Sequence, residues 1–585
     1  MTDRPTLEVL HRHLFGLLLA VATFIVVAKA YVAGQDLHEN FAKMGNDDIM
    51  RLTVVRDLIA GQSWFDTTQY RLLPPDGLSL HWSRYIDAGI AAIILPLSLV
   101  MPMDTAEQLA VAIWPTLIML ITLCLVAFGT RRIFGVAPAI FAMMCLVLWP
   151  LTAEVHASVG NIDHHNVQLL LSIGVVFATI WPASEKAAGL AGGLAAAFSL
   201  AIGLENLLFI VVAGLVLVVR SALDQPFAAR RLVAFCVALG LGSTLFWLGQ
   251  APPASRFAFI CDQLAPPILS LVWVAVIASV APLALRLRVS GAVQLGLTIA
   301  LTVVGLVLIW PMLASCQAGP YGNLPVVLRD YISDSIVEAL PAIAYAKDYP
   351  APAIIFTLPV IAALFFGASL WFKERGTPLG ILMVFCVVGS ALVFYQMRTV
   401  IMVAAAVPMI AGVVIARLLA DYLAARDLTR GLVAIFATAA FVAPTLFAQV
   451  VQPFLPDKSA PATAVAAECR TYAGLQSLND VPPSVIFTHG NFGGPLIWAT
   501  HHDALGAPYH RSAAALTNGA LAYAMEEPAF RSHVMDTSAE YVLLCRGMSY
   551  QSAFLTELAA EATTGWLQPV PLDDPHQILL KVLRE

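Results

Sequence analysis

The chain has 585 residues, of which 59% are hydrophobic and only 12% are charged. Soluble proteins carry roughly 25% charged residues, so this composition excludes an ordinary soluble domain. The apolar residues lie in runs of about 17–25, the length of helix that spans a bilayer core, which indicates a polytopic membrane protein. The net charge of −6 says little about partners, because the side of the membrane on which each charge lies matters more.

Thirteen of these runs are predicted to be transmembrane helices. The first is interpreted as a retained span, because no small-residue cleavage site follows it and hydrophobic segments continue. A further piece, 88–103, is interrupted by Pro96 and Pro102, and its length of about 16 residues favours an interfacial or re-entrant position. The predicted spans lie near 14–33, 109–129, 134–150, 165–181, 188–203, 205–220, 232–249, 267–285, 291–313, 351–371, 378–395, 397–417 and 431–448.

The basic residues predict the orientation. If the N-terminus is cytoplasmic and 88–103 does not cross, one set of Lys and Arg residues near the ends of the spans falls on the cytoplasmic side, as the positive-inside rule requires. The groups are Arg131, Arg132, Lys186, Arg220, Arg230, Arg231, Arg286, Arg288, Lys373, Arg375, Arg417, Arg426 and Arg430. The Ala- and Arg-rich, Lys-poor composition is typical of GC-rich bacteria. We therefore expect a bacterial inner-membrane protein with a cytoplasmic N-terminus and a periplasmic C-terminal domain.

This topology gives two regions, a membrane domain 1–450 and a C-terminal domain 451–585. The stretches VIFTH, EYVLLC and HQILLKVL in the tail predict a small α/β fold. The longer outer loops are 34–108, 151–164 and 314–350, and a short one covers 250–266. An oxidising exterior permits the disulfides Cys261–Cys316 and Cys469–Cys545, with unpaired buried thiols as the alternative.

The first outer loop holds two groups of candidate binding residues. Asp47 and Asp48 follow the first span, and Arg51 lies one turn beyond them. Arg51 could orient a carboxylate or contact a phosphate. In the alternative interpretation, Asp47 is only the N-cap of a helix 48–60. The segment HWSRYID supplies His81 and Arg84, with Trp82 and Asp87, either as a wall of a ligand site or as an interfacial anchor.

Three other segments carry candidate residues. In GNIDHH, Asp163 and His165 have a spacing that lets both reach one divalent ion, whereas the alternative makes Asp163 a helix N-cap. Glu338 lies in the later outer loop, in SDSIVEALP. Arg398, in QMRTVIM, is a charge near the outer boundary of the last helices, either functional or a snorkelling arginine.

The predicted sidedness brings these residues together at the outer membrane face. Carboxylates that share a site need a cation or a proton, and a divalent metal on Asp47, Asp163, His165 and Glu338 would satisfy them. An arginine beside the metal would hold a phosphate. This combination fits transfer of a group from a lipid-linked phosphate donor.

The order of these motifs resembles the catalytic subunits of oligosaccharyltransferases, members of the C-type glycosyltransferase superfamily, over roughly residues 10–450. The archaeal branch is most similar, because its second motif also resembles G-x-x-D-H-H. The resemblance implies a C-type glycosyltransferase fold, a polyprenyl-linked sugar donor and Mg²⁺ or Mn²⁺. It assigns metal and acceptor roles to Asp47 and Glu338, metal binding to Asp163 and His165, and the donor phosphate to Arg398. Asp48 is a second-choice ligand, and His164 has no assigned role.

The C-terminal domain departs from the family. The Trp-Trp-Asp motif that reads the peptide sequon is missing, and SVIFTHGNFGGPLIWATHHDALGAPYHR occupies the similar place. The acceptor is therefore left open among a protein, a lipid and a polysaccharide. His510 and Arg511, with His489, His501 and His502, are candidates to line its pocket or are surface and turn residues.

These observations predict a membrane glycosyltransferase, and the family resemblance implies a single displacement with inversion. Asp47, Asp163 and Glu338 would be catalytic, and Arg398, Arg51, His81, Arg84, His510 and Arg511 would bind substrate. Within the enzyme class, the alternative is a single-sugar transferase that modifies lipid A or an exopolysaccharide. A lipid-linked sugar flippase or secondary transporter is the alternative of another class, although transporters place their charges nearer the bilayer midplane. The expected partners are the polyprenyl-linked donor, membrane lipids and the acceptor, without nucleic acid.

Overall fold

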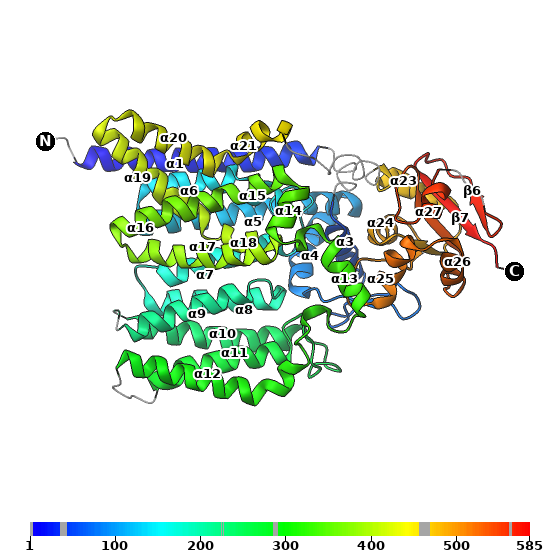
Figure 1. Cartoon of the computed structure of the whole chain (residues 1–585), viewed down its shortest axis with the longest axis horizontal. Helices are drawn as coiled ribbons and strands as arrows, with labels where there is room; N and C mark the ends of the chain where they lie inside the picture. The colour runs from blue at the N-terminus through cyan, green and yellow to red at the C-terminus, as the bar shows by residue number, and fades with distance from the viewer. Residues whose placement is uncertain are drawn as a thin grey trace.

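The computed structural model describes residues 4–35, 44–223, 225, 227–284, 290–454, 468–560 and 564–584, without the side chains of 4–12, 284, 334, 335 and 338. Figure 1 shows a bundle of roughly parallel helices and, at one end of it, a smaller domain that contains a sheet. Between the two lie α3 (Asn46–Ile59), α4 (Arg84–Ser98) and α13 (Val326–Ser335). The chain therefore has a long axis that runs from the helical bundle to the C-terminal domain.

Each of the thirteen predicted spans corresponds to an apolar helical segment among the described residues. Nine of these described segments are long and apolar enough to cross a membrane. They are α1 (Arg4–Gly34), α5 (Met103–Phe134), α8 (Glu185–Ile202), α10 (Ala228–Gln250), α11 (Pro266–Ala284), α12 (Gly291–Ala314), α15 with α16 (Pro350–Ala362, Ala368–Glu374), α17 (Thr377–Tyr395) and α19 (Val407–Ala425). Three are shorter, namely α6 (Val136–Leu148), α7 (His165–Ile180) and α9 (Leu207–Ala222).

The last predicted spans differ from the observed helices. The segment predicted at 431–448 is two helices, α20 (Leu428–Val442) and α21 (Pro444–Val451), bent by 89° where Pro444 cannot continue the hydrogen-bond ladder. The segment predicted at 397–417 begins with a 3₁₀ turn at Met397–Thr399 and a short α18 (Val400–Ala404) before α19. This break puts Arg398 on irregular backbone at the end of α17.

Small residues allow the closest helix approach in the bundle. A Cβ atom on Gly189 would lie 2.5 Å from the carbonyl oxygen of Arg231, and one on Gly193 would lie 2.3 Å from that of Phe235. The two glycines are one turn apart on α8, so its backbone rests directly against α10. Close approach at small residues is the usual way in which helices pack in a bilayer.

The C-terminal domain contains a five-stranded sheet in the order β4-β3-β5-β7-β6, which confirms the predicted α/β character of the tail. The strand β3 (Val485–Thr488) pairs in parallel with β4 (Asp503–Ala504) and β5 (Tyr541–Cys545). Antiparallel pairing adds β7 (Gln577–Val582) and β6 (Leu567–Val570). The domain helices are α23 (Tyr472–Gln476), α24 (Gly490–Ala499), α25 (Ala513–Gly519), α26 (Glu527–Met535) and α27 (Ala553–Leu558).

The C-terminal domain and the first outer loop share one hydrophobic core. Met50 and Leu52 of α3 belong to the same buried cluster as Leu496 and Ile497 of α24. The loop also contains the short strands β1 (Thr68–Gln69) and β2 (Leu78–Ser79), and Arg71 beside them donates to the backbone oxygens of Ile497, Thr500 and His502. This shared core fixes the domain on the end of the bundle.

Both predicted disulfides are present. Cys261–Cys316 joins two outer loops, and Cys469–Cys545 lies within the C-terminal domain. Among the described residues, the free thiols are Cys124, Cys145, Cys236 and Cys386, all on helices of the bundle.

Candidate active site

Asp163 lies immediately before α7, at the end of the bundle that faces the C-terminal domain. Its Oδ1 accepts from Arg51 Nη2 at 2.7 Å and lies 2.8 Å from His164 Nδ1. Its Oδ2 lies 3.5 Å from His165 Nε2. The N-cap of α7 is His164, without a side-chain cap. The alternative that Asp163 is an N-cap is therefore wrong, and its carboxylate joins two histidines to an arginine.

Arg51 is completely buried and bridges two carboxylates. Besides Asp163, it donates from Nη1 to Asp87 Oδ1 at 3.0 Å, and its guanidinium lies 4.5 Å from the ring centroid of Trp82. Burial by itself would raise the pKa of the Asp163 carboxyl, but His164 and Arg51 hold that pKa well below its usual range. Asp163 is consequently ionised.

The motif HWSRYID forms the support for this bridge. Arg84 is also buried, and it pairs with Asp87 Oδ2 at 3.3 Å and donates to Gln62 Oε1 at 2.9 Å. The guanidinium groups of Arg51 and Arg84 are thus occupied by protein carboxylates. Substrate binding by these two arginines stays a prediction, and the geometry shows them orienting Asp87 and Asp163.

The two aspartates of GNDD have different surroundings. Asp48 is buried, and its Oδ1 accepts from the backbone N–H groups of Ile162 and Asp163, each at 2.8 Å, which ties α3 to the second outer loop. Burial and the neighbouring Asp163 raise the pKa of Asp48 to about 8. Asp47 is exposed in the first turn of α3, whose N-cap is Gly45, so the alternative that Asp47 is the N-cap is wrong.

A polar cavity of about 420 Å³ places Asp47 with the second outer loop. Asp163 and His165 line the same cavity, together with Ile336 of the later outer loop and Asn491 of α24. The structure therefore brings Asp47, Asp163 and His165 together, as the sequence predicted. Glu338, the fourth predicted ligand, has a side chain outside the described residues, although its backbone forms a 3₁₀ turn two residues beyond Ile336.

His164 receives a partner that the sequence analysis missed. Its Nε2 lies 3.0 Å from Glu205 Oε1, in the connection between α8 and α9. Burial would lower the pKa of His164, but the carboxylates of Asp163 and Glu205 raise it to about 10. The signal for Glu205 in the sequence is a lone carboxylate between two apolar segments, a position where a charge is a candidate functional residue.

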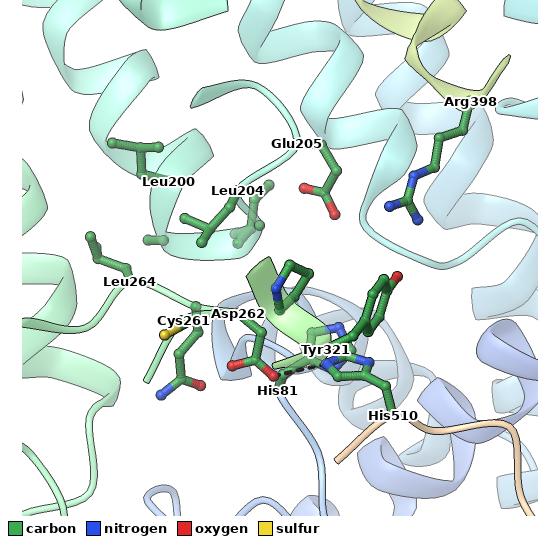
Figure 2. A pocket seen from close by; sticks show the side chains of 15 residues that line it. His81, Leu200, Leu204, Glu205, Cys261, Asp262, Leu264, Tyr321, Arg398 and His510 are labelled. Atoms are coloured by element: carbon green, nitrogen blue, oxygen red, sulfur yellow. Dashed lines mark hydrogen bonds and ion pairs between the residues drawn. The ribbon is translucent and has the colours of Figure 1, made fainter. Parts of the chain in front are cut away.

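Arg398 faces this group from the break between α17 and α18. Its Nε donates to Gln396 Oε1 at 3.0 Å. Figure 2 shows its guanidinium pointing into a cavity next to Glu205. The side chain therefore points into the protein at the end of the bundle nearest the C-terminal domain, rather than along the outside of the bundle as a snorkelling arginine would.

Of the predicted ligand wall, His81 alone lines this cavity, where it belongs to a second cluster with Asp262 and His510 on the other side (Figure 2). Asp262, which the sequence analysis also missed, accepts from Arg511 at both oxygens at 2.7 Å and lies 2.9 Å from His510 Nε2. The ring centroid of His81 lies 4.7 Å from that of His510. Burial lowers the pKa of His81 to about 3, and His510 adds to this effect. His81 and His510 thus line a cavity, and Arg511 holds Asp262.

The three other candidate histidines of the C-terminal domain have structural contacts. His489 caps α24, where its Nδ1 accepts from the backbone N–H of Asn491. His501 Nε2 lies 2.8 Å from the carbonyl oxygen of Val481, and His502 Nε2 lies 2.7 Å from that of Leu478. Their proposed role in an acceptor pocket stays a prediction.

Three cavities meet at this site. An apolar cavity of about 360 Å³ is lined by Phe356, Leu392, Tyr395 and other residues of α15, α17 and α18, and at its polar end by His165, Glu205 and Arg398. It shares Glu205 and Arg398 with the cavity of Figure 2, and it shares His165 with the cavity of Asp47. An apolar compartment, a cationic side chain and an anionic site are therefore contiguous.

The Asp163 group has the chemistry of a divalent-metal site. One ligand atom from each of Asp163, His164 and His165 lies within 4.8 Å of the others. Arg51 and His164 occupy Asp163 Oδ1, so Oδ2 and His165 Nε2 are the pair on the cavity side, with the Asp47 carboxylate in the same cavity. Carboxylate oxygens and one imidazole suit Mg²⁺, Mn²⁺ or Zn²⁺. The residues present therefore fit a divalent metal, and Asp47, Asp163 and His165 are the predicted ligands whose side chains line this cavity.

No protein-family model and no curated protein matches the chain. Solved structures of the oligosaccharyltransferase AglB from Archaeoglobus fulgidus do match. The complex with an inhibitory peptide and dolichol phosphate has a TM-score of 0.68 at 12% identity, over 98% of this chain and 76% of that one. The complex tethered to an acceptor peptide has a TM-score of 0.67 at 12% identity, over 91% and 69%. The complex with zinc and sulfate has a TM-score of 0.62 at 13% identity, over 90% and 68%. The chain has the fold of the archaeal oligosaccharyltransferase, the C-type glycosyltransferase fold that its motifs predicted.

Proposed function

We propose that the protein is a membrane glycosyltransferase that transfers a sugar or oligosaccharide from a polyprenyl-phosphate lipid to an acceptor at the outer membrane face. The observation that carries this proposal is the apolar cavity that ends at Arg398 and opens toward His165 and Glu205. A polyprenyl chain needs the apolar compartment, and its phosphate needs a cation at the end of that compartment. The structural similarity to AglB, one structure of which holds dolichol phosphate, supports the same assignment.

Arg398 would bind the donor phosphate through its guanidinium, which offers paired N–H donors to phosphate oxygens. As the sugar leaves the carrier, negative charge grows on that phosphate, and a fixed cation stabilises this charge. Gln396, which accepts from Arg398 Nε, orients the side chain so that its Nη atoms face the cavities.

Asp47, Asp163 and His165 would hold a Mg²⁺ or Mn²⁺ ion, with Glu338 as a further predicted ligand. A bound divalent ion would stabilise the negative charge that develops on the leaving phosphate. Arg51, Asp48 and His164 act on these ligands, since they fix the carboxylate and backbone of Asp163. This arrangement leaves Oδ2 of Asp163 beside His165, which lines the cavity.

The acceptor would enter the cavity that Asp47 shares with the C-terminal domain. The exposed Asp47 carboxylate, which lines this cavity, would orient or deprotonate the attacking group in a single displacement. The missing Trp-Trp-Asp motif leaves a glycan, a lipid or a protein as the acceptor. We further propose an inner-membrane location with this face in the periplasm, based on the distribution of Lys and Arg.

A flippase or transporter would place its charges near the middle of the bundle. Here Asp163, Glu205 and Arg398 lie at helix ends beside the C-terminal domain, a position that supports an enzyme.

The experiment is a transfer assay with purified protein, polyprenyl-linked donors and an extract of membrane glycolipids and polysaccharides, read by mass spectrometry. We expect transfer by the wild type, loss in Arg398→Ala, and loss in EDTA that Mn²⁺ restores. Arg531→Ala, which removes an exposed arginine on α26, is the matched control and should retain activity. Binding of polyprenyl phosphate that is equal in wild type and Arg398→Ala would refute the assignment of the donor site.

A further inference from the structure

The cavity of Figure 2 has a volume of about 280 Å³ and is built from distant segments of the chain. One side consists of Leu204 and Glu205, with Arg398 beside them. Asp262 and His510 lie on the opposite side. This cavity is the polar continuation of the apolar cavity beyond Arg398, because both are lined by Glu205 and Arg398.

Several polar atoms in this cavity have unused hydrogen-bonding capacity. Within the part of the chain that the structure describes, the ring nitrogens of His81, the hydroxyl of Tyr321 and the Nη atoms of Arg398 make no hydrogen bond. The rings of His81 and Tyr321 both contact that of His510. Donors and acceptors beside aromatic faces are what a ligand rich in hydroxyl groups requires.

The acidic side chains of the cavity are already paired. Glu205 lies 3.0 Å from His164 Nε2, and Asp262 binds Arg511 through both oxygens. A donor phosphate would pair with Arg398. A charged group on a ligand inside the cavity would therefore lack a free partner of opposite charge, and burying an unpaired charge is costly.

Covalent and ionic contacts hold the walls in place. The disulfide Cys261–Cys316 joins the segment that holds Asp262 to the segment that holds Tyr321. Arg511 joins Asp262 to the first outer loop, since it also donates to the carbonyl oxygen of Leu80 at 3.0 Å. The shape of the cavity is thus set by three loops and the C-terminal domain together.

We propose that this cavity binds the sugar of the lipid-linked donor, and that the sugar is a single uncharged residue. The inference rests on the proposed function, because it takes the phosphate to lie at Arg398. A volume of about 280 Å³ is below the roughly 300–1,000 Å³ of pockets for drug-sized ligands, and so suits one sugar rather than a chain of sugars. His81 and Tyr321 then determine the specificity for the donor.

The test measures equilibrium binding of three probes to the purified full chain: undecaprenyl phosphate, the same lipid bearing glucose, and the same lipid bearing a cationic amino sugar. We expect the wild type to bind the glucosyl lipid most tightly. Tyr321→Phe and His81→Phe each remove hydrogen-bonding atoms and keep a ring, so each should weaken binding of the glucosyl lipid about threefold to tenfold. Tyr70→Phe, in the first outer loop and hydrogen-bonded to Asp66, is the matched control.

The outcomes separate this inference from the proposed function. Equal binding of the bare and glucosyl lipids by the wild type, or an unchanged affinity for the glucosyl lipid in both ring variants, overturns the sugar site. Binding of the amino-sugar lipid as tightly as the glucosyl lipid overturns the assignment to an uncharged sugar. Arg398→Ala should weaken all three probes, and an unchanged affinity for undecaprenyl phosphate would instead overturn the proposed function.

Discussion

Two clusters in this protein contain the same residue types and differ in what they offer to a ligand. Each combines one aspartate, two histidines and an arginine. The members are Asp163, His164, His165 and Arg51 in one cluster, and Asp262, His81, His510 and Arg511 in the other. The first derives its aspartate and histidines from three consecutive residues, whereas the second draws its members from three distant parts of the chain.

The position of the arginine makes the difference. Arg51 contacts only Oδ1 of Asp163, so Oδ2 stays on the side of His165. Arg511 takes both oxygens of Asp262, one of which also lies 2.9 Å from His510. A carboxylate held at one oxygen can still bind a metal, whereas one held at both acts as a structural anion. The clusters are therefore suited to different tasks, metal binding in one and shaping of a pocket in the other.

The largest expected effect comes from Asp163→Asn. The amide keeps the size of the side chain and removes the charge, so Mn²⁺ binding should be lost. Transfer should fall by roughly 100-fold to 1,000-fold, because metal-held charge stabilises the transition state by several kcal/mol. Electron paramagnetic resonance of Mn²⁺ and the transfer assay provide the two measurements.

Asp262→Asn is the matched variant in the other cluster. It should retain the Mn²⁺ signal and weaken binding of the sugar-bearing donor, because Arg511 loses its anion at the wall of the cavity. If Asp262→Asn abolished Mn²⁺ binding and Asp163→Asn did not, the roles assigned to the two clusters would be reversed.

The next effect is on stability. Arg51→Met leaves the carboxylates of Asp87 and Asp163 without their shared cation in a buried site, and loss of one partner of a buried pair costs about 3–5 kcal/mol of unfolding free energy. Arg511→Met should cost less, because the Arg511 side chain is 19% exposed and water can solvate the remaining anion. Denaturant unfolding in detergent measures both, and equal losses would contradict this difference in burial.

The two clusters also show what could be predicted from the sequence. Runs of apolar residues predicted the positions of the thirteen apolar helical segments of the bundle, because a bilayer imposes a minimum length on each span. The D-H-H motif identified the first cluster, since its members are adjacent and follow an outer loop. The bend at Pro444 was missed, because an apolar run does not show how the backbone turns within it.

The second cluster was only partly predictable. His510 and Arg511 were recognised as polar residues near a possible pocket, but their partner Asp262 lies in a short loop with no distinctive spacing. Glu205 was missed for a related reason. Its role depends on a contact with His164, and that contact forms only because α7 packs beside α8. Contacts between segments so distant along the chain require the folded structure.

The smallest expected effect distinguishes the clusters by pH. The carboxylates of Asp163 and Glu205 overcome burial and raise the pKa of His164 from 6.5 to about 10, so its contribution to stability is complete below pH 6.5 and is lost as the pH rises toward 10. Burial lowers the pKa of His81 from 6.5 to about 3, so its contribution is present above pH 6.5 and is lost as the pH falls toward 3. In EDTA, the unfolding temperature of His164→Gln should decline less than that of the wild type on the alkaline side, and that of His81→Gln should decline less on the acid side. If the unfolding temperatures of the wild type and both variants changed with pH in parallel, the two histidines would not differ in charge. The arginines would then be the only difference between the two clusters.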